Sequence, residues 1–207
     1  ISTGKRHDFV VDYRVGFDDA GRILGVEGDW YARCGFSADL SQAVTDRALF
    51  HADNAYYYPA VELRSHPMRT NTCSNTAFRG FGGPQGVIVA ERIIEEIAYA
   101  TGQDTLAVRK ANLYRNGQLT PYHQPVEDNI LERIVGELEA SSNYQRRRME
   151  IAAFNAARPF FRLPFRCTRS ARRPRSVSTS KSPRACAALM TPKLAFWPGT
   201  RRSLASS

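Results

Sequence analysis

Several features that would place a protein in a special class are missing from this sequence of 207 residues. No run of roughly 18 consecutive apolar residues occurs, so we expect no transmembrane helix. The four cysteines (Cys34, Cys73, Cys167 and Cys186) are far apart and form no CxxC pair, which argues against zinc and iron–sulfur sites and predicts buried or incidental thiols. The chain begins at Ile1 without a secretory signal pattern, so we expect a piece of a longer, cytoplasmic protein.

Acidic residues are absent from one part of the chain. Residues 1–150 carry 17 Lys or Arg and all 20 Asp or Glu, a net charge of −3, whereas residues 151–207 carry 12 Lys or Arg and no acid, a net charge of +12. The formal charge of +9 therefore comes from the C-terminal end. Residues 158–207 also hold six of the eleven prolines and show no sustained helix or strand period, so we predict an irregular or disordered basic tail.

Before the tail, the sequence pattern predicts strands first and helices afterwards. Strands are expected at 9–15, 22–33 and 60–69, and helices at 41–51, 84–101, 104–113, 131–138 and 142–157. Pro67 confines the third strand to a sheet edge or a bulge, while Gly25 and Gly28 indicate a bulge or a close backbone approach in the second strand. The order favours an α+β fold over alternating βαβ units.

The clearest helix pattern begins at Pro84 and ends at Gly102. Apolar residues recur between them at three- and four-residue steps, at Val87, Ala90, Ile94, Ile97 and Ala98. One face of this helix therefore belongs to the core.

The segment Asn75–Gly86, NTAFRGFGGPQG, is the most informative for function. Its glycines (Gly80, Gly82 and Gly83) permit positive φ and a close approach of the backbone to a ligand. Pro84 opens the helix, whose free N–H groups favour an anion such as a phosphate, and Arg79 adds a cation. Gln85 stands where a dinucleotide-binding GxGxxG loop needs glycine, and no Gly-Lys-Ser/Thr follows, so neither familiar nucleotide loop is present.

Four segments resemble the xanthine dehydrogenase and aldehyde oxidase family. They are TGKRH at 3–7, DRALFHADNAY at 46–56, RTN at 69–71 and NTAFRGFGGPQG at 75–86. The resemblance implies that residues 1–157 are a partial molybdopterin-binding domain and that residues 158–207 lie outside it. It also implies a molybdenum–molybdopterin cofactor, with FAD and 2Fe-2S clusters on other domains or subunits of the complete enzyme.

The same resemblance assigns roles to individual residues. It implies that Arg79, Gly80, Gly82 and Gly83 are cofactor-binding residues, and that no residue of the chain ligates the metal directly. It implies that Phe81 packs against a flat purine. Arg47, which lies 32 residues before Arg79, is expected to face the purine carbonyl oxygen and to stabilise negative charge on the ring. Since aldehyde oxidases generally lack a basic residue there, Arg47 favours xanthine or hypoxanthine, oxidised towards urate, as substrate.

Each of these residues has a structural alternative. Arg47 is also compatible with a solvated or salt-bridged side chain on a short helix, Phe81 with a core anchor, and Arg79 with a clamp on its own loop. The histidines have no metal-ligand spacing and are expected to be structural or exposed; they are His7, His51, His66 and His123.

The family's general base, a glutamate near the end of a much longer chain, is absent here, so no catalytic residue is assigned and the isolated chain is expected to be inactive. The onset of the acid-free tail indicates a reading-frame shift or a mistaken gene model, because the family would continue into further strands and glycine-rich loops. An alternative is a nonenzymatic protein that binds nucleic acid through its basic tail. We expect instead a purine substrate, an FAD and iron–sulfur partner domain or subunit, and no membrane.

Overall fold

The computed structural model describes residues 4–157, 188–190 and 193–195. These residues belong to two compact units, which are treated separately below. The first contains residues 4–129 and the two short C-terminal segments, and the second contains residues 130–157. Within the described ranges, no helix combines the length and the apolar character that a membrane crossing requires.

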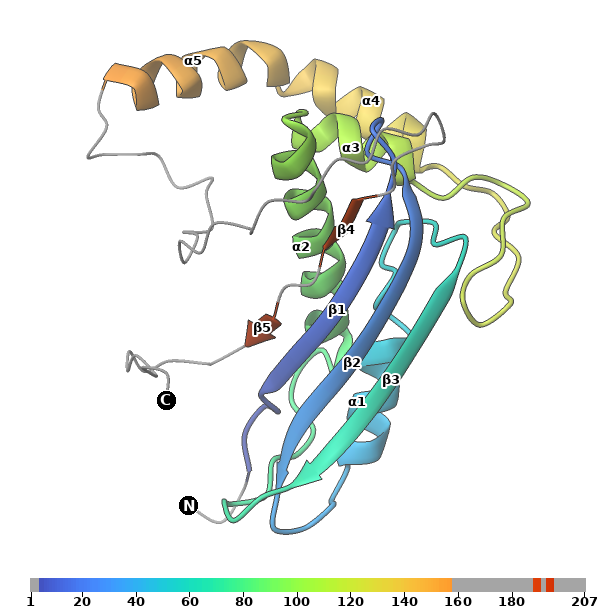
Figure 1. The fold of residues 1–207 in the computed structure, drawn as a ribbon, viewed down its shortest axis with the longest axis vertical. Helices are drawn as coiled ribbons and strands as arrows, with labels where there is room; N and C mark the ends of the chain where they lie inside the picture. The colour runs from blue at the N-terminus through green and yellow to red at the C-terminus, as the bar shows by residue number, and fades with distance from the viewer. Residues whose placement is uncertain (1–3, 158–187, 191–192, 196–207) are drawn as a thin grey trace. The chain divides into compact units, whose positions relative to one another are not determined.

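The first unit is built on a twisted sheet of three long strands, β1 (Phe9–Phe17), β2 (Ile23–Gly35) and β3 (Val61–Arg69) (Figure 1). β1 and β2 form an antiparallel hairpin, and β3 lies parallel to β2 on the far edge. Two short strands from the C-terminal end, β4 (Ala188–Met190) and β5 (Lys193–Ala195), pair antiparallel with β1. Within the predicted irregular tail, these six residues form two short strands; the rest of 158–207 lies outside the described residues.

Glycines shape the hairpin as its sequence predicts. A register shift separates the pairs Gly16–Gly25 and Phe17–Ile23, so a bulge lies beside Gly25. A Cβ atom at Gly28 would lie 2.5 Å from the ring of Trp30, the next residue on the same face of β2. Gly28 thus makes room for the fully buried Trp30 ring. The expected bulge is confirmed, whereas the close neighbour of Gly28 is a side chain rather than the expected backbone.

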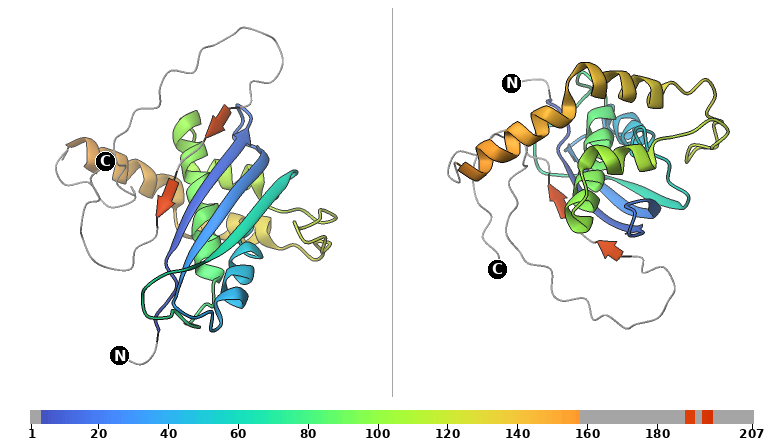
Figure 2. Two further views of the ribbon diagram at one scale, coloured as in Figure 1. Left: turned by 60° about the horizontal axis from the view of Figure 1, so that its bottom comes forward. Right: turned by 90° about the horizontal axis from the view of Figure 1, so that it is seen from above.

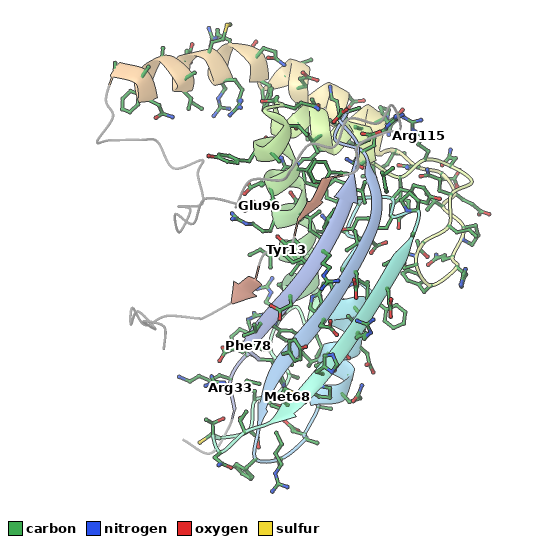
Figure 3. All side chains as sticks on the ribbon, in the orientation of Figure 1. Tyr13, Arg33, Met68, Phe78, Glu96 and Arg115 are labelled. Carbon is green, nitrogen blue, oxygen red and sulfur yellow. The ribbon has the colours of Figure 1, made fainter. Side chains whose placement is uncertain are left out.

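Three helices complete the first unit: α1 (Ser41–Leu49), α2 (Gly83–Thr101) and α3 (Thr105–Asn112). α1 and α2 lie on one face of the sheet (Figure 2). Side chains on that face alternate along β1 and meet the apolar stripe of α2; the fully buried members include Phe9, Val11, Val15, Val89, Ile93, Ile94 and Ile97. Tyr13 of β1 and Glu96 of α2 lie close together at this layer (Figure 3). The predicted core face of the helix is confirmed.

The two helices that cover the sheet approach each other unusually closely at the start of α2. A Cβ atom at Gly86 would overlap the carbonyl oxygen of Ala48, and a Cβ atom at Gly82 would overlap that of Val44. Only glycine leaves room for backbone against backbone here. α1 therefore packs directly on the glycine-rich segment.

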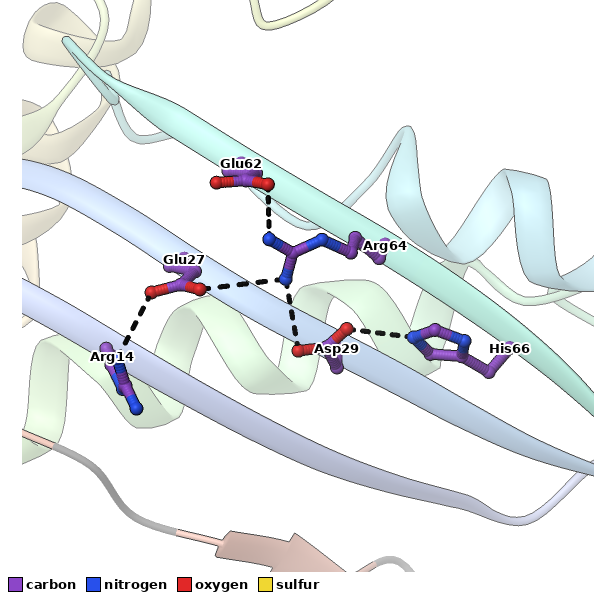
Figure 4. A network of polar contacts seen from close by, with 6 residues as sticks. All are labelled: Arg14, Glu27, Asp29, Glu62, Arg64 and His66. Carbon is purple, nitrogen blue, oxygen red and sulfur yellow. Dashed lines mark hydrogen bonds and ion pairs between the residues drawn. The ribbon is translucent and has the colours of Figure 1, made fainter.

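The opposite face of the sheet carries a network of ion pairs (Figure 4). Arg64 on β3 contacts Glu62, Glu27 and Asp29, and Asp29 also pairs with His66 at 2.8 Å. The hydrogen bond from His66 holds the pKa of the Asp29 carboxyl below its usual value, with Arg64 adding to the effect. These side chains are substantially exposed, so solvent screens the pairs and each adds little to the stability of the fold. The network marks this face as a polar surface rather than a second core.

The second unit consists of α4 (Leu131–Ser141) and α5 (Tyr144–Ala157). Neither helix buries a residue in the structure. The apolar stripe that predicts α4 is present on the helix, and its members Ile134 and Leu138 are exposed.

The expected α+β fold is confirmed, with one refinement. The sheet is mixed rather than purely antiparallel, because the connection from β2 through α1 to β3 is a crossover that makes a parallel pair. β3 is an edge strand within the described sheet, as Pro67 requires.

Gly86→Ala should destabilise the 207-residue chain, because the new methyl group would force α1 away from α2. We expect the free energy of unfolding to fall by about 2–3 kcal/mol, the upper part of the range for overpacking. Gly136→Ala in α4 is the matched control, since nothing lies within 4 Å of a Cβ there, and it should change stability by less than about 1 kcal/mol. Urea unfolding followed by circular dichroism measures both; equal effects would show that the close approach is not a constraint.

Candidate functional site

The glycine-rich segment forms a tight left-handed turn between Phe78 and the start of α2. Three consecutive residues have positive φ: Gly80 at +92°, Phe81 at +47° and Gly82 at +92°. The turn is closed by hydrogen bonds from the Phe81 amide to the Phe78 carbonyl, at 2.7 Å, and from the Gly83 amide to the Gly80 carbonyl, at 2.9 Å. A phenylalanine in the left-handed region is strained and persists only where the surroundings hold it. Such strain is concentrated at functional sites.

Arg6 holds this turn from outside. Its Nη2 donates to the Arg79 carbonyl oxygen at 2.7 Å, and its guanidinium lies 4.4 Å from the centroid of the Phe78 ring. The clamp on the loop is therefore supplied by the side chain of Arg6, and Arg79 takes part only through its backbone.

The structure separates the proposed cofactor residues into two groups. Arg79 and Gly80 are exposed, and the Arg79 guanidinium forms no ion pair within the described ranges. Gly82 and Gly83 are buried against α1 and His51. Packing against α1 accounts for glycine at 82, and the ring of His51 accounts for glycine at 83, so the contact of either residue with a cofactor stays a prediction.

The first turn of the helix, where an anion site is expected, already uses some of its amides. The Gln85 amide donates to the Gly82 carbonyl at 3.1 Å, and the Gly83 amide is bonded to the Gly80 carbonyl at 2.9 Å. Pro84 has no amide hydrogen. Two of the N–H groups that a helix start can offer to a phosphate are thus bonded within the chain, and the anion site stays a prediction. The sequence could not show this, because it depends on the left-handed turn.

A shallow hollow lies beside the turn, and it encloses no space for even a water molecule. Its lining residues are Arg6, His7, Val44, Thr76, Phe78, Phe81, Gly82 and Gln85. Three buried polar atoms of these residues have no hydrogen-bond partner among the described residues: Arg6 Nη1, His7 Nδ1 and Gln85 Oε1. Pockets for small molecules usually enclose about 300–1,000 Å³, so the described residues form at most one side of such a pocket.

His7 is the ionisable residue deepest in this hollow, with 2% of its surface exposed. Its Nε2 forms a hydrogen bond with the Ser41 hydroxyl at 2.8 Å, and its carbonyl accepts from Gln85 Nε2 at 3.2 Å. Burial lowers the pKa of His7 below its ordinary 6.5, although the carboxylates of Asp39 and Asp8 oppose the shift. Of the two expected cases, structural or exposed, the buried and hydrogen-bonded His7 corresponds to the structural one.

Arg47 is exposed on the last turn of α1, and its guanidinium forms no ion pair with a described residue. Its Nε donates to His51 Nε2 at 3.4 Å. The ring of His51 in turn lies against Gly83, where a Cβ atom would be 2.6 Å from Cδ2. Arg47 and the turn that carries Phe81 therefore share one neighbour.

Phe81 is only partly buried, which does not fit the alternative of a core anchor. Its ring lines the hollow, and the next residue, Gly82, contacts α1 at Val44, three positions before Arg47. The structure thus places the two proposed substrate residues on adjoining elements of one unit.

Sequence reasoning missed four residues of this region: Arg6, His7, His51 and Gln85. The signal for three of them was available, because Arg6 and His7 belong to TGKRH and His51 to DRALFH, two of the segments that carry the family resemblance. Nothing local in the sequence reveals that residues 6 and 79 are in contact, since 73 positions separate them.

Two observations bear on whether a pterin cofactor fits here. Within the described ranges, no three side chains of His, Cys, Asp or Glu converge to bind a metal ion. The exposed turn offers the uncompensated Arg79 guanidinium and unpaired buried donors and acceptors beside it. The outer part of the turn, at Arg79 and Gly80, fits such a group; the inner part is filled by α1.

Comparison with known proteins decides the family. The model of the molybdopterin cofactor-binding domain matches residues 1–113. This chain belongs to that family. It is 44% identical over 155 residues to xanthine dehydrogenase/oxidase of Mus musculus and 46% identical over 155 residues to that of Gallus gallus, in each case over 75% of the chain. The resemblance drawn from the four sequence segments is confirmed.

A solved structure supports the same assignment. Aldehyde oxidoreductase from Desulfovibrio desulfuricans matches 71% of the chain with a TM-score of 0.63 and 28% sequence identity. The chain spans 12% of the mouse protein, 11% of the chicken protein and 16% of the aldehyde oxidoreductase chain. The matches to the mouse and chicken proteins extend past the family domain, while the boundary at residue 157 stays a prediction.

His7 should make the stability of the chain sensitive to acid. Because its pKa is lowered by folding, the unfolded chain binds the proton more readily between that lowered value and 6.5, and the folded state loses stability as the pH falls through this window. Urea unfolding at about pH 7 and about pH 5 measures how much of the free energy of unfolding is lost on acidification. This loss should be smaller for His7→Gln than for the parent chain. His123→Gln, in an exposed turn, is the control. If His7→Gln loses as much unfolding free energy between the two pH values as the parent chain, His7 is not the source of the acid sensitivity.

Proposed function

We propose that this chain supplies one wall of the cofactor and purine site of a xanthine dehydrogenase-type molybdenum hydroxylase. The observation that carries the proposal is the strained, partly exposed Phe81, held beside an arginine-bearing helix in a chain of the molybdopterin cofactor-binding family. Molybdopterin, when bound, supplies the redox chemistry that hydroxylates a ring carbon with oxygen from water, while FAD and 2Fe-2S clusters lie elsewhere in the complete enzyme. Phe81 and Arg47 bind and orient the substrate.

Phe81 offers an aromatic face of fixed direction. The left-handed backbone and the two hydrogen bonds of the turn restrict where the ring can lie. An aromatic ring packs well against a planar heterocycle in offset or edge-to-face geometry. A purine fits this surface better than a small aldehyde, which has little area to cover the ring.

Arg47 offers a positive charge that no described carboxylate compensates. Asp46, its neighbour in sequence, accepts a hydrogen bond from Gln42 at 2.7 Å. A free guanidinium binds a carbonyl oxygen and stabilises negative charge that develops there during attack on the ring. This role favours xanthine or hypoxanthine as substrate.

Arg79 and Gly80 are the residues that would hold the cofactor. Arg79 is an exposed donor beside the turn, and Gly80 brings the backbone to the surface without a side chain. Arg6 donates a hydrogen bond to the Arg79 carbonyl and so holds the backbone at Arg79 and Gly80. The purine substrate and the partner domains or subunits with FAD and 2Fe-2S clusters belong to the same proposal, whereas no observation on the described residues favours nucleic acid.

A chimera tests the proposal. Residues 1–157 replace the matching segment of the mouse xanthine dehydrogenase/oxidase, and urate formation from xanthine is measured together with molybdenum content. Arg47→Met should lower kcat/KM by about 100-fold or more with molybdenum content unchanged, because a charge that acts in the transition state is lost. Arg133→Met, an exposed arginine of α4, is the matched control and should retain activity. Activity of Arg47→Met within twofold of the parent chimera would refute the role of Arg47.

The isolated chain should form no urate. The described residues enclose no space beside the turn for a purine and a pterin, and the chain spans only about an eighth of the mouse protein. Expression with molybdopterin supplied, followed by metal analysis and a urate assay, measures this. Urate formation that disappears in Arg47→Met would show that the chain alone is sufficient.

A further inference from the structure

His51 occupies a position between the two parts of the proposed site. It follows α1 directly, and its Nε2 lies 3.4 Å from Arg47 Nε. On its other side, ring atom Cδ2 lies where a side chain at Gly83 would have to be. A Cβ atom at Gly86 would also lie 2.9 Å from the His51 carbonyl carbon. The residue is therefore held against the start of α2 through both its ring and its backbone.

The hydrogen bonds of His51 define its tautomer. An arginine Nε–H can only donate, so Nε2 of the ring must be the acceptor and carry no hydrogen. Nδ1 then carries the proton and donates to the Phe50 carbonyl oxygen at 3.1 Å. Both ring nitrogens have partners, and the ring plane is fixed from two sides.

This arrangement orients Arg47 without cancelling its charge. His51 in the neutral tautomer uses only the Nε–H of the guanidinium, which leaves the two terminal amino groups available for a ligand. A carboxylate at the same place would compensate the positive charge. Among the described residues, Asp46 forms no ion pair with Arg47, and its Oδ1 accepts a hydrogen bond from Gln42.

We propose that His51 is a positioning residue, which fixes the plane of the Arg47 guanidinium and ties it to the glycine-rich turn that carries Phe81. The inference rests on the proposed function, because it states how the substrate-binding arginine is held. It also explains glycine at position 83, because a side chain there would displace the ring and, with it, Arg47.

The tautomer provides a readout that needs no activity. In the 207-residue chain at about pH 8, where a free imidazole is largely neutral, nitrogen NMR shifts should show His51 protonated at Nδ1 and unprotonated at Nε2. Arg47→Met removes the donor, so the Nε2-protonated tautomer, the form favoured in free histidine, should gain population. A His51 ring protonated at Nε2 in the parent chain would overturn the proposal, whatever the enzyme assay gives.

Kinetics in the chimera test the positioning role. His51→Leu keeps a side chain of moderate size but removes the hydrogen-bond acceptor. This variant should lower kcat for xanthine about tenfold, with a smaller change in KM. His51→Gln presents an oxygen acceptor and should restore most of the rate. The melting temperatures of the two variants should agree, because both keep the space beside Gly83 filled.

A double variant separates this inference from the proposed function. His51→Leu combined with Arg47→Met should be no slower than Arg47→Met alone, because His51 acts through Arg47. Multiplied losses in the double variant, or equal rates for His51→Leu and His51→Gln, would overturn the inference while Arg47 keeps its role. Full activity of Arg47→Met would instead refute the proposed function. In that case the tautomer seen by NMR still decides whether His51 accepts a hydrogen bond from Arg47.

Discussion

The close contact between α1 and the start of α2 is the constraint on which the site depends. Backbone meets backbone where Gly82 and Gly86 lie against the carbonyls of Val44 and Ala48, and no other residue type fits there without moving a helix. The contact is made inside the first unit, on the face of the sheet that carries the core. The contact between α1 and α2 is therefore part of the packed layer formed by the sheet and its helices.

The consequences for the site follow from this contact. The contact of α1 with α2 restricts the backbone of the left-handed turn. Phe81 is therefore held in a conformation that an unconstrained phenylalanine avoids. Arg47, one helical turn beyond Val44, is brought to the same end of α2, with His51 between them. Binding groups that are 34 positions apart are thus preorganised before any ligand arrives.

Much of the fold could be predicted from the sequence. The α2 helix follows from its apolar period, its Pro84 start and its Gly102 end, and the hairpin follows from its alternation and its turn residues. The parallel pairing of β2 and β3 was missed, because strand direction depends on the crossover through α1 rather than on local pattern. The short strands β4 and β5 were missed for a related reason: three-residue strands have no period to detect.

The site was predicted unevenly. Arg47 and Phe81 were chosen through a family resemblance and not through their local chemistry, which favours ordinary alternatives for each. The anion site at the helix start stays a prediction, although the Gly82 carbonyl already accepts from the Gln85 amide. His51 was expected only to be structural or exposed, since its contacts with Arg47 and Gly83 become visible only when α1 and α2 are packed together.

The measurement that tests the account most directly is a crystal structure of the complete chimeric enzyme with molybdopterin and a purine bound. The account predicts the Phe81 ring packed on the purine and the terminal nitrogens of Arg47 within hydrogen-bonding distance of a purine oxygen. A purine held elsewhere, with either side chain directed away from it, would contradict the central claim that one glycine-mediated helix contact assembles the substrate wall.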